Sequence, residues 1–133
     1  MRYLLDVNVL LAAIWVTHAE HARADAWVQN KQLATCPITE LGFLRISTHP
    51  KALKATMRDA RRLLENFHSQ LTPAFAADDL KPLKSNPPTS HEVTDHYLAD
   101  LAASRGMKIA TLDANLKHPA AELIPLPPGA PDK

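Results

Sequence analysis

The chain has 133 residues, of which 46% are hydrophobic, so it is long enough and apolar enough to bury the core of one domain. Its formal net charge is +1, and any contact with a nucleic acid must therefore come from a local basic patch. The single cysteine, Cys36, excludes an internal disulfide and a zinc site built from several cysteines. This cysteine usage fits a reducing, cytoplasmic location.

The apolar stretch from residue 3 to residue 16 predicts a buried strand and a helix, with no association with a membrane. Asp6 and Asn8 interrupt it, and no run reaches the roughly 18–20 apolar residues that a membrane-spanning helix needs. We expect residues 2–5 to form the strand and residues from about 8 to 16 the helix. The side chains of Asp6 and Asn8 can accept hydrogen bonds from free backbone N–H groups at the turn between these elements.

Strand and helix patterns alternate through the rest of the chain. The expected elements are, in order, a helix at 19–29, a strand at 33–38, a helix at 40–49 capped by Thr39, a helix at 52–70, a short strand at 73–77, a helix from about 89 to 106, a strand at 108–112 and a strand at 122–126. This alternation predicts an α/β fold with a mostly parallel sheet. We expect a single domain, residues 1–126, followed by a flexible tail, residues 127–133.

Four acids are expected on one rim of this sheet, where ligands of open α/β sheets bind. Asp6 and Asp113 stand at the carboxyl ends of predicted strands, Glu40 lies just beyond a third strand, and Asp95 lies near the start of a helix. Two unit charges about 4 Å apart repel by about 4 kcal/mol at an effective dielectric constant near 20. Mg²⁺ or Mn²⁺ would relieve this repulsion, and such a metal centre suits the hydrolysis of phosphodiesters.

The segments around these acids resemble the PIN-domain ribonucleases, and specifically the VapC-type toxins of bacterial toxin–antitoxin modules. They read LLDVNVLLA around Asp6, PITELGFLRIS around Glu40, VTDHYLADLA around Asp95 and ATLDANL around Asp113. The resemblance covers nearly the whole chain. It implies a three-layer α/β/α fold and RNA cleavage that depends on Mg²⁺ or Mn²⁺. It also implies a homodimer that a cognate VapB-type antitoxin holds inactive.

The resemblance assigns the catalytic metal site to the same four acids. It makes Asp6, Asp95 and Asp113 the expected metal ligands, directly or through water. Glu40 is expected either to bind the metal or to orient the attacking water.

Polar neighbours of these acids complete the expected site. Asn8, Thr39 and Thr111 match polar positions of the family and are candidates for steadying the site or contacting the substrate. Asp100 departs from the family, in which many relatives carry a small apolar residue there. It lies about 140° around the helix from Asp95, so we expect it at the surface or an interface, beside His96.

The helix expected at 52–70 carries an apolar stripe from Leu53 to Phe67 and a basic face. The basic residues are Lys51, Lys54, Arg58, Arg61 and Arg62. A solvated surface is the usual explanation of such a run of charge, and Asp59 and Glu65 dilute it. Two functional alternatives stay open: contact with the RNA backbone, for which Lys54, Arg58 and Arg61 are the candidates, and contact with the antitoxin.

Simpler explanations and other functions also stay open. Each acid taken alone is explained as a cap or a first-turn residue of a helix. The chain could be a catalytically degenerate PIN module that only binds RNA or an antitoxin. A phosphatase-like domain uses an aspartate nucleophile, often with a second acid near it on the first strand, where this chain has Asn8. The seven histidines include no convincing zinc site, because neither His18 with His21 nor His91 with His96 has an obvious third ligand.

Overall fold

The computed structural model describes residues 1–126, and the tail expected at residues 127–133 lies outside the described residues. Its centre is a sheet in the strand order β3-β2-β1-β4-β5, in which every pairing is parallel. The strands are β1 (Arg2–Leu5), β2 (Gln32–Thr35), β3 (Ala74–Phe75), β4 (Lys108–Thr111) and β5 (Ala121–Leu123). The expected α/β fold with a parallel sheet is confirmed, although several strands are shorter than predicted.

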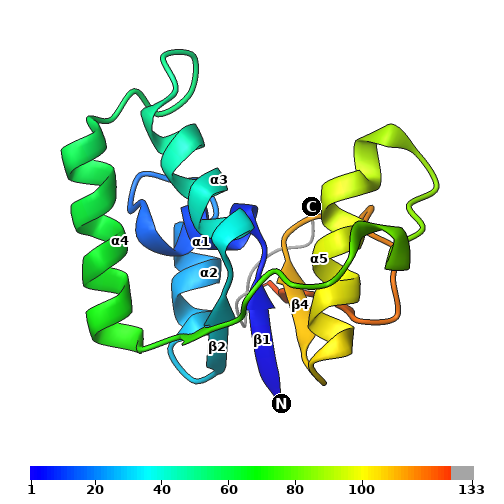
Figure 1. Ribbon diagram of the computed structural model, residues 1–133. Helices are drawn as coiled ribbons and strands as arrows, with labels where there is room; N and C mark the ends of the chain where they lie inside the picture. Colours follow the sequence, from blue (N-terminus) through cyan, green and yellow to red (C-terminus); the bar gives the residue numbers. More distant parts are fainter. Residues whose placement is uncertain (127–133) are drawn as a thin grey trace.

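Helices cover both faces of this sheet (Figure 1). They are α1 (Val7–Ile14), α2 (His21–Val28), α3 (Pro37–Thr48), α4 (Met57–Leu71) and α5 (Val93–Ser104), with short 3-10 turns at Pro82–Lys84 and Ser90–Glu92. Helices α1 to α4 pack on one face and α5 packs on the other. Within the part of the chain described, no helix is long and apolar enough to cross a membrane.

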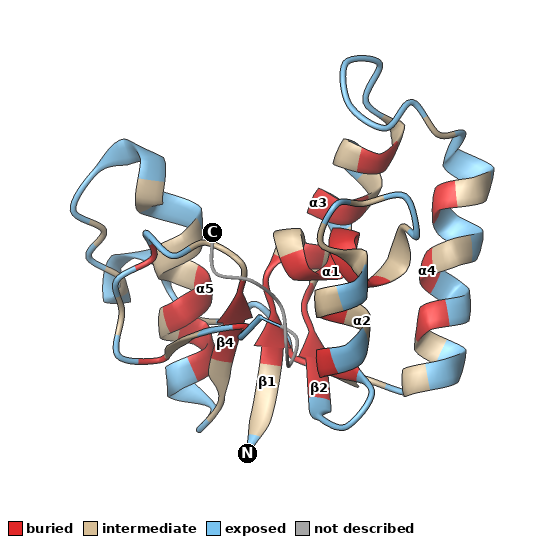
Figure 2. Ribbon diagram, turned by 180° about the vertical axis from the view of Figure 1, so that it is seen from behind, coloured by how far each residue is buried: buried red, intermediate tan, exposed pale blue. Residues whose placement is uncertain are grey.

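Alternation along the strands explains the two cores. In β1, Leu5 joins the core under α1 to α4, whereas Leu4 joins the core under α5. The neighbouring strand β4 repeats this arrangement with Ala110 and Ile109. Successive side chains of a strand point to opposite faces, so adjacent apolar residues of these central strands are buried on opposite sides of the sheet. Figure 2 shows this buried centre, and α4 buried along one face and exposed along the other.

The start of α3 differs from the expectation. Thr39 is not the residue that caps this helix: Cys36 occupies the cap position, Pro37 is the first helical residue and Thr39 is the third. Proline suits the first helical position because its missing N–H would have no partner there. The Thr39 hydroxyl accepts a hydrogen bond from the Cys36 backbone N–H at 3.1 Å, which strengthens the start of the helix from inside.

The start of α4 also differs, and it corrects the predicted basic face. Helix α4 begins at Met57, because the Thr56 hydroxyl caps it by accepting a hydrogen bond from the Asp59 N–H at 3.1 Å. Lys51 and Lys54 therefore lie in the loop between α3 and α4 rather than on the helix, and Lys54 has a positive φ of 58°. The other three basic residues, Arg58, Arg61 and Arg62, are on α4.

Candidate functional site

Two of the four acids meet at the carboxyl ends of adjacent central strands. Strand β1 pairs with β4 so that Leu5 lies opposite Ala110. Asp6, the next residue, continues the pairing through its N–H, which donates to the Ala110 carbonyl at 3.0 Å. Asp113 follows the end of β4 by two residues. Parallel pairing of these strands is thus what brings residues more than a hundred positions apart onto one rim.

Thr111 is the centre of the hydrogen bonds on this rim. Its hydroxyl donates to Asp6 Oδ2 at 2.9 Å, and it accepts from the Asp113 N–H at 3.0 Å and from Asn8 Nδ2 at 3.3 Å. Asn8 Oδ1 accepts from the Leu112 N–H at 3.1 Å. Thr111 therefore orients the Asp6 carboxylate and the backbone at Asp113, and Asn8 holds the end of β4 against the start of α1.

Electrostatics couples three of the acids. Burial raises the pKa of Asp6 from its ordinary value of 3.8 to about 6, the charges of Asp95 and Asp113 add to this rise, and hydrogen bonds from Thr111 and Val7 oppose it. The pKa of Asp95 is also raised, first by burial and then by the charge of Asp113. We call Asp6, Asp95 and Asp113 the aspartate trio, because their charges lie close enough to repel one another.

Glu40 lies in a separate hydrogen-bonded group. Its Oε2 accepts a hydrogen bond from the Thr35 hydroxyl at 2.6 Å and another from His68 Nε2 at 2.9 Å. These partners come from the end of β2 and the last turns of α4. Glu40 is not among the charges that raise the pKa of Asp6 or Asp95. The structure therefore places the trio together and gives Glu40 its own partners.

A metal could be held by the aspartate trio, although the trio does not form a closed set of ligands. Among residues 1–126, no three side chains of His, Cys, Asp or Glu are close enough together to enclose an ion. The chemistry of the trio nevertheless fits a hard cation such as Mg²⁺ or Mn²⁺. It offers only carboxylate oxygens, and a cation would offset the repulsion from Asp95 and Asp113 that adds to the effect of burial on the pKa of Asp6.

The segment that carries Asp113 is anchored to the helix that carries Asp95. His118 Nδ1 accepts from the Ala120 N–H at 2.9 Å, so the proton is on Nε2, which donates to Asp100 on α5 at 2.7 Å. The buried side chain of Leu116 packs in the core under α5. These contacts fix the position of Asp113 relative to Asp95.

Asp100 was expected at the surface or an interface beside His96, and the structure shows it half-buried and bonded to His118. Burial tends to raise the pKa of this carboxyl, but Ser85, His118 and His96, which lie beside it, lower it overall. The His96 ring lies edge-on to that of His118, with 5.5 Å between centroids. Asp100 is therefore a structural partner of His118.

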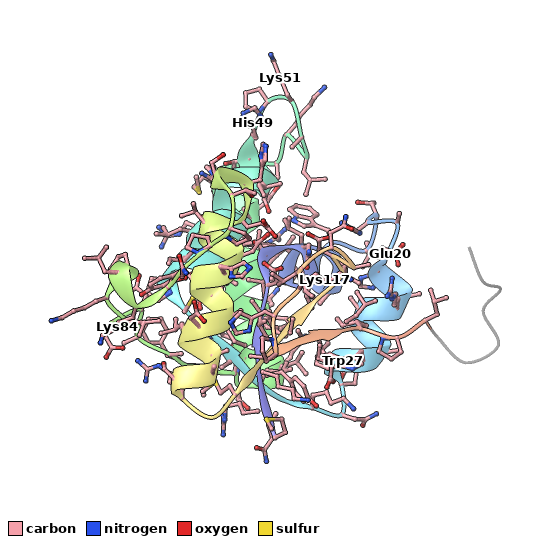
Figure 3. All side chains as sticks on the ribbon, turned by 90° about the vertical axis from the view of Figure 1, so that its right-hand side faces the viewer. Glu20, Trp27, His49, Lys51, Lys84 and Lys117 are labelled. Atoms are coloured by element: carbon pink, nitrogen blue, oxygen red, sulfur yellow. The ribbon has the colours of Figure 1, made fainter. Side chains whose placement is uncertain are left out.

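The remaining substrate candidates divide by exposure. Thr39 is fully buried, and its hydroxyl is used within α3, so it is not available to a substrate. Lys54, Arg58 and Arg61 are exposed. Figure 3 shows Lys51 extending into solvent from the tip of the loop that also carries Lys54. These cations could contact an extended polyanion.

Sequence reasoning missed the two partners of Glu40. Thr35 had a usable signal, because it lies within the predicted strand 33–38, five residues before Glu40. His68 had none, since it lies 28 positions away on another helix. Only the packing of α4 against α3 brings His68 to the rim.

Comparison with known proteins relates the chain to one family. Residues 3–122 match the PIN domain. Ribonuclease VapC38 of Mycobacterium tuberculosis is 41% identical over 121 residues, which cover 85% of this chain and 86% of the relative. Ribonuclease VapC29 of the same organism is 32% identical over 134 residues, which cover 94% of this chain and 98% of the relative.

A solved structure shares the fold. It is a chain of the crystal structure of VapBC2 from Rickettsia felis, bound to a DNA fragment from their promoter. The two chains superimpose with a TM-score of 0.62 at 16% sequence identity, and the match covers 92% of this chain and 97% of the other.

Proposed function

Since the chain belongs to the PIN-domain family and is of the VapC type, we propose that it is an endoribonuclease and the toxin of a VapBC-type toxin–antitoxin module. The observation that carries the proposal is the aspartate trio, with Asp6 and Asp113 at the carboxyl ends of β1 and β4 and Asp95 in the first turn of α5. The chain that carries it is 41% identical to a protein named as a ribonuclease. The proposed reaction is hydrolysis of an RNA phosphodiester bond by water, with products that carry 5′-phosphate and 3′-hydroxyl ends.

Dependence on Mg²⁺ or Mn²⁺ is part of this proposal, with Asp6, Asp95 and Asp113 as the residues that would hold the ion. When bound, the ion supplies a Lewis acid that lowers the pKa of a water molecule and neutralises charge on the phosphate. The rest of the chemistry belongs to the protein. Asn8 and Thr111 orient Asp6 and the backbone at Asp113. The groups that would hold the metal are therefore positioned before the substrate binds.

Glu40 is proposed to orient the attacking water. Both of its hydrogen bonds go to Oε2, and Oε1 accepts none from the part of the chain that the structure describes. Thr35 and His68 thus fix the rotation of the carboxylate and leave one oxygen for a water molecule. A carboxylate held in this way can accept a hydrogen bond from water that approaches the phosphorus atom.

RNA binding is proposed to use exposed cations of α4 and of the loop before it. Arg58 and Arg61 on α4 and Lys54 in the preceding loop are the candidates for contacts with phosphates, which supply affinity without base specificity. Arg62 is less available, because it lies 3.4 Å from Asp59 in an exposed ion pair. A VapB-type antitoxin is part of the proposal, supported by the VapC names of the relatives. A homodimer and a cytoplasmic location complete it, and they rest on the family resemblance and the cysteine usage.

The test is cleavage of total RNA with and without Mg²⁺ or Mn²⁺, followed by sequencing of the new 5′ ends. The wild type should cut only when the metal is present, and Asp6→Asn and Asp95→Asn should lose at least a hundredfold in rate. Asp25→Asn is the matched control, because Asp25 lies on α2 and bonds Gln29. Equal cutting by the wild type and both rim variants, or no cutting by any of them, would refute the proposal.

The phosphatase alternative loses support from the surroundings of Asp6. Such a domain often has a second acid near the nucleophile, and Asn8 stands there instead. Both ends of its amide are already used, by Leu112 and Thr111.

A further inference from the structure

A cavity of about 510 Å³ lies next to the acidic rim, and the proposed hydrolysis does not use it. It opens between the start of α3, the segment 78–87 and the first turns of α5. Its lining includes Ile38, two residues before Glu40, and Thr94, the residue before Asp95. The elements that carry two of the four acids therefore also form walls of this cavity. Its volume is in the usual range of small-ligand sites, about 300–1,000 Å³.

One wall of the cavity is a rigidly held aromatic ring. The Tyr97 hydroxyl lies 2.7 Å from the Leu80 carbonyl and 3.0 Å from the Asp78 carbonyl. These contacts tie the segment 78–80 to α5 and keep the ring from rotating away. Ile38 and Val93 add apolar surface to the same cavity. A flat apolar ligand could stack there at little cost in side-chain entropy.

Asp78 is the charged residue of the cavity's lining, and the hydroxyls of Ser85, Thr94 and Tyr97 are its other polar side-chain groups. Asp78 is exposed and contributes a carboxylate, which accepts hydrogen bonds and donates none. Lys81 and Lys84 are exposed on either side of Pro82, which belongs to the lining. Figure 3 shows Lys84 pointing outward from this segment. The ligand should therefore combine an aromatic ring, N–H donors and a nearby negative charge.

We propose that this cavity binds one unpaired base of the RNA substrate beside the scissile phosphate, with a preference for guanine. Guanine presents N1–H and N2–H side by side, and the two oxygens of the Asp78 carboxylate can accept both. Uracil offers a single N–H between two carbonyls, which the carboxylate repels. Lys81 and Lys84 would contact the phosphates on either side of the base. Unpaired bases that stack on aromatic side chains and bond through their edges are the usual targets of sequence-specific RNA binding.

The inference deepens the proposed function and rests on it, so the first experiment measures cleavage. A randomised RNA is cut by the wild type, Asp78→Asn and Asp79→Asn, and the cut sites are sequenced. The wild type should favour guanine at one position next to the cut, and Asp78→Asn should reduce that preference about tenfold. Asp79→Asn should not change it, because Asp79 is the adjacent exposed acid but bonds Arg105 outside the lining. No preference in the wild type, or an unchanged one in Asp78→Asn, would overturn the inference.

A second experiment separates the base site from the nuclease activity. The trinucleotides UGU and UUU, and free GMP, are titrated into Asp6→Asn while the amide signals of Thr94 and Tyr97 are followed by NMR. UGU should shift both signals and bind about tenfold more tightly than UUU or GMP, and Asp6→Asn/Asp78→Asn should lose the difference. Equal binding of UGU and UUU would overturn the inference even if the protein cuts RNA. Binding of GMP as tight as that of UGU would also overturn the inference, because the cavity would then be a site for a free nucleotide. Loss of the Thr94 and Tyr97 signals only on dimerisation would overturn it as well, because a second copy of the chain would then fill the cavity.

Discussion

Replacing Asp6 by asparagine should make the metal-free protein less sensitive to pH between about pH 4 and pH 7. In the folded wild type the pKa of Asp6 is about 6, against an ordinary value of 3.8. A raised pKa means that the folded state holds the proton more tightly than the unfolded state. The stability contributed by that proton is complete below about pH 4 and is lost as the pH rises through about 6.

The magnitude follows from the burial of this carboxyl. Asp6 is 4% exposed, so solvent screens its interactions little. A difference of about two pKa units, at 1.36 kcal/mol each, corresponds to about 3 kcal/mol of unfolding free energy lost between pH 4 and pH 7. Asparagine cannot ionise and avoids this loss. It also leaves the Thr111 hydroxyl proton without its carboxylate acceptor, at a cost of about 1 kcal/mol that does not depend on pH.

The assay is urea unfolding in EDTA at pH 4, 5, 6 and 7, followed by tryptophan fluorescence. The unfolding free energy of Asp6→Asn relative to wild type should rise by about 3 kcal/mol from pH 4 to pH 7. Asp25→Asn is the control and should follow the wild type. Wild-type and Asp6→Asn profiles that stay parallel within about 1 kcal/mol would refute the electrostatic account of the rim.

Three further predictions concern the same rim. Mn²⁺ at about 100 times its dissociation constant should stabilise the wild type by about 2.7 kcal/mol and Asp6→Asn far less. The measurement is the shift in melting temperature, and equal shifts in both proteins would argue against the trio as the metal site. Gly42→Ala should destabilise the protein by about 1–3 kcal/mol in urea unfolding, because the added Cβ would lie 2.7 Å from Val7 Cγ2. Unchanged stability would show that α1 and α3 can separate there. His68→Ala should lower kcat about tenfold at constant KM, because His68 orients Glu40. His68→Gln should restore part of this loss, and an unchanged kcat in His68→Ala would refute the orienting role.

Local patterns were enough to identify the positions of the acids. Asp6 and Asp113 follow short apolar strands, and the parallel sheet placed them on one rim as expected. Asp95 lies in the first turn of α5, also as expected. These positions could be predicted because a buried strand, and the turn that ends it, depend mainly on nearby residues.

Element boundaries were harder to predict where two local signals competed. Pro50 correctly marked the end of α3, but the helical pattern that follows suggested a start at residue 52. The cap at Thr56 instead starts α4 at Met57. As a result, two of the five expected basic residues, Lys51 and Lys54, lie on a loop. A single side-chain cap can outweigh several residues of helical propensity, because each residue contributes only a few tenths of a kcal/mol.

The sequence by itself determined the fold class, the order of the strands along the chain and the family, because these depend on periodicity and on short motifs. Only the tertiary structure decided how the acids divide. The charges of Asp6, Asp95 and Asp113 repel one another, whereas Glu40 accepts hydrogen bonds from Thr35 and His68. The physical reason is that charge repulsion and hydrogen bonding depend on distances of a few ångströms between elements. Those distances are set by the packing of whole helices on the sheet, which no local segment of the sequence specifies.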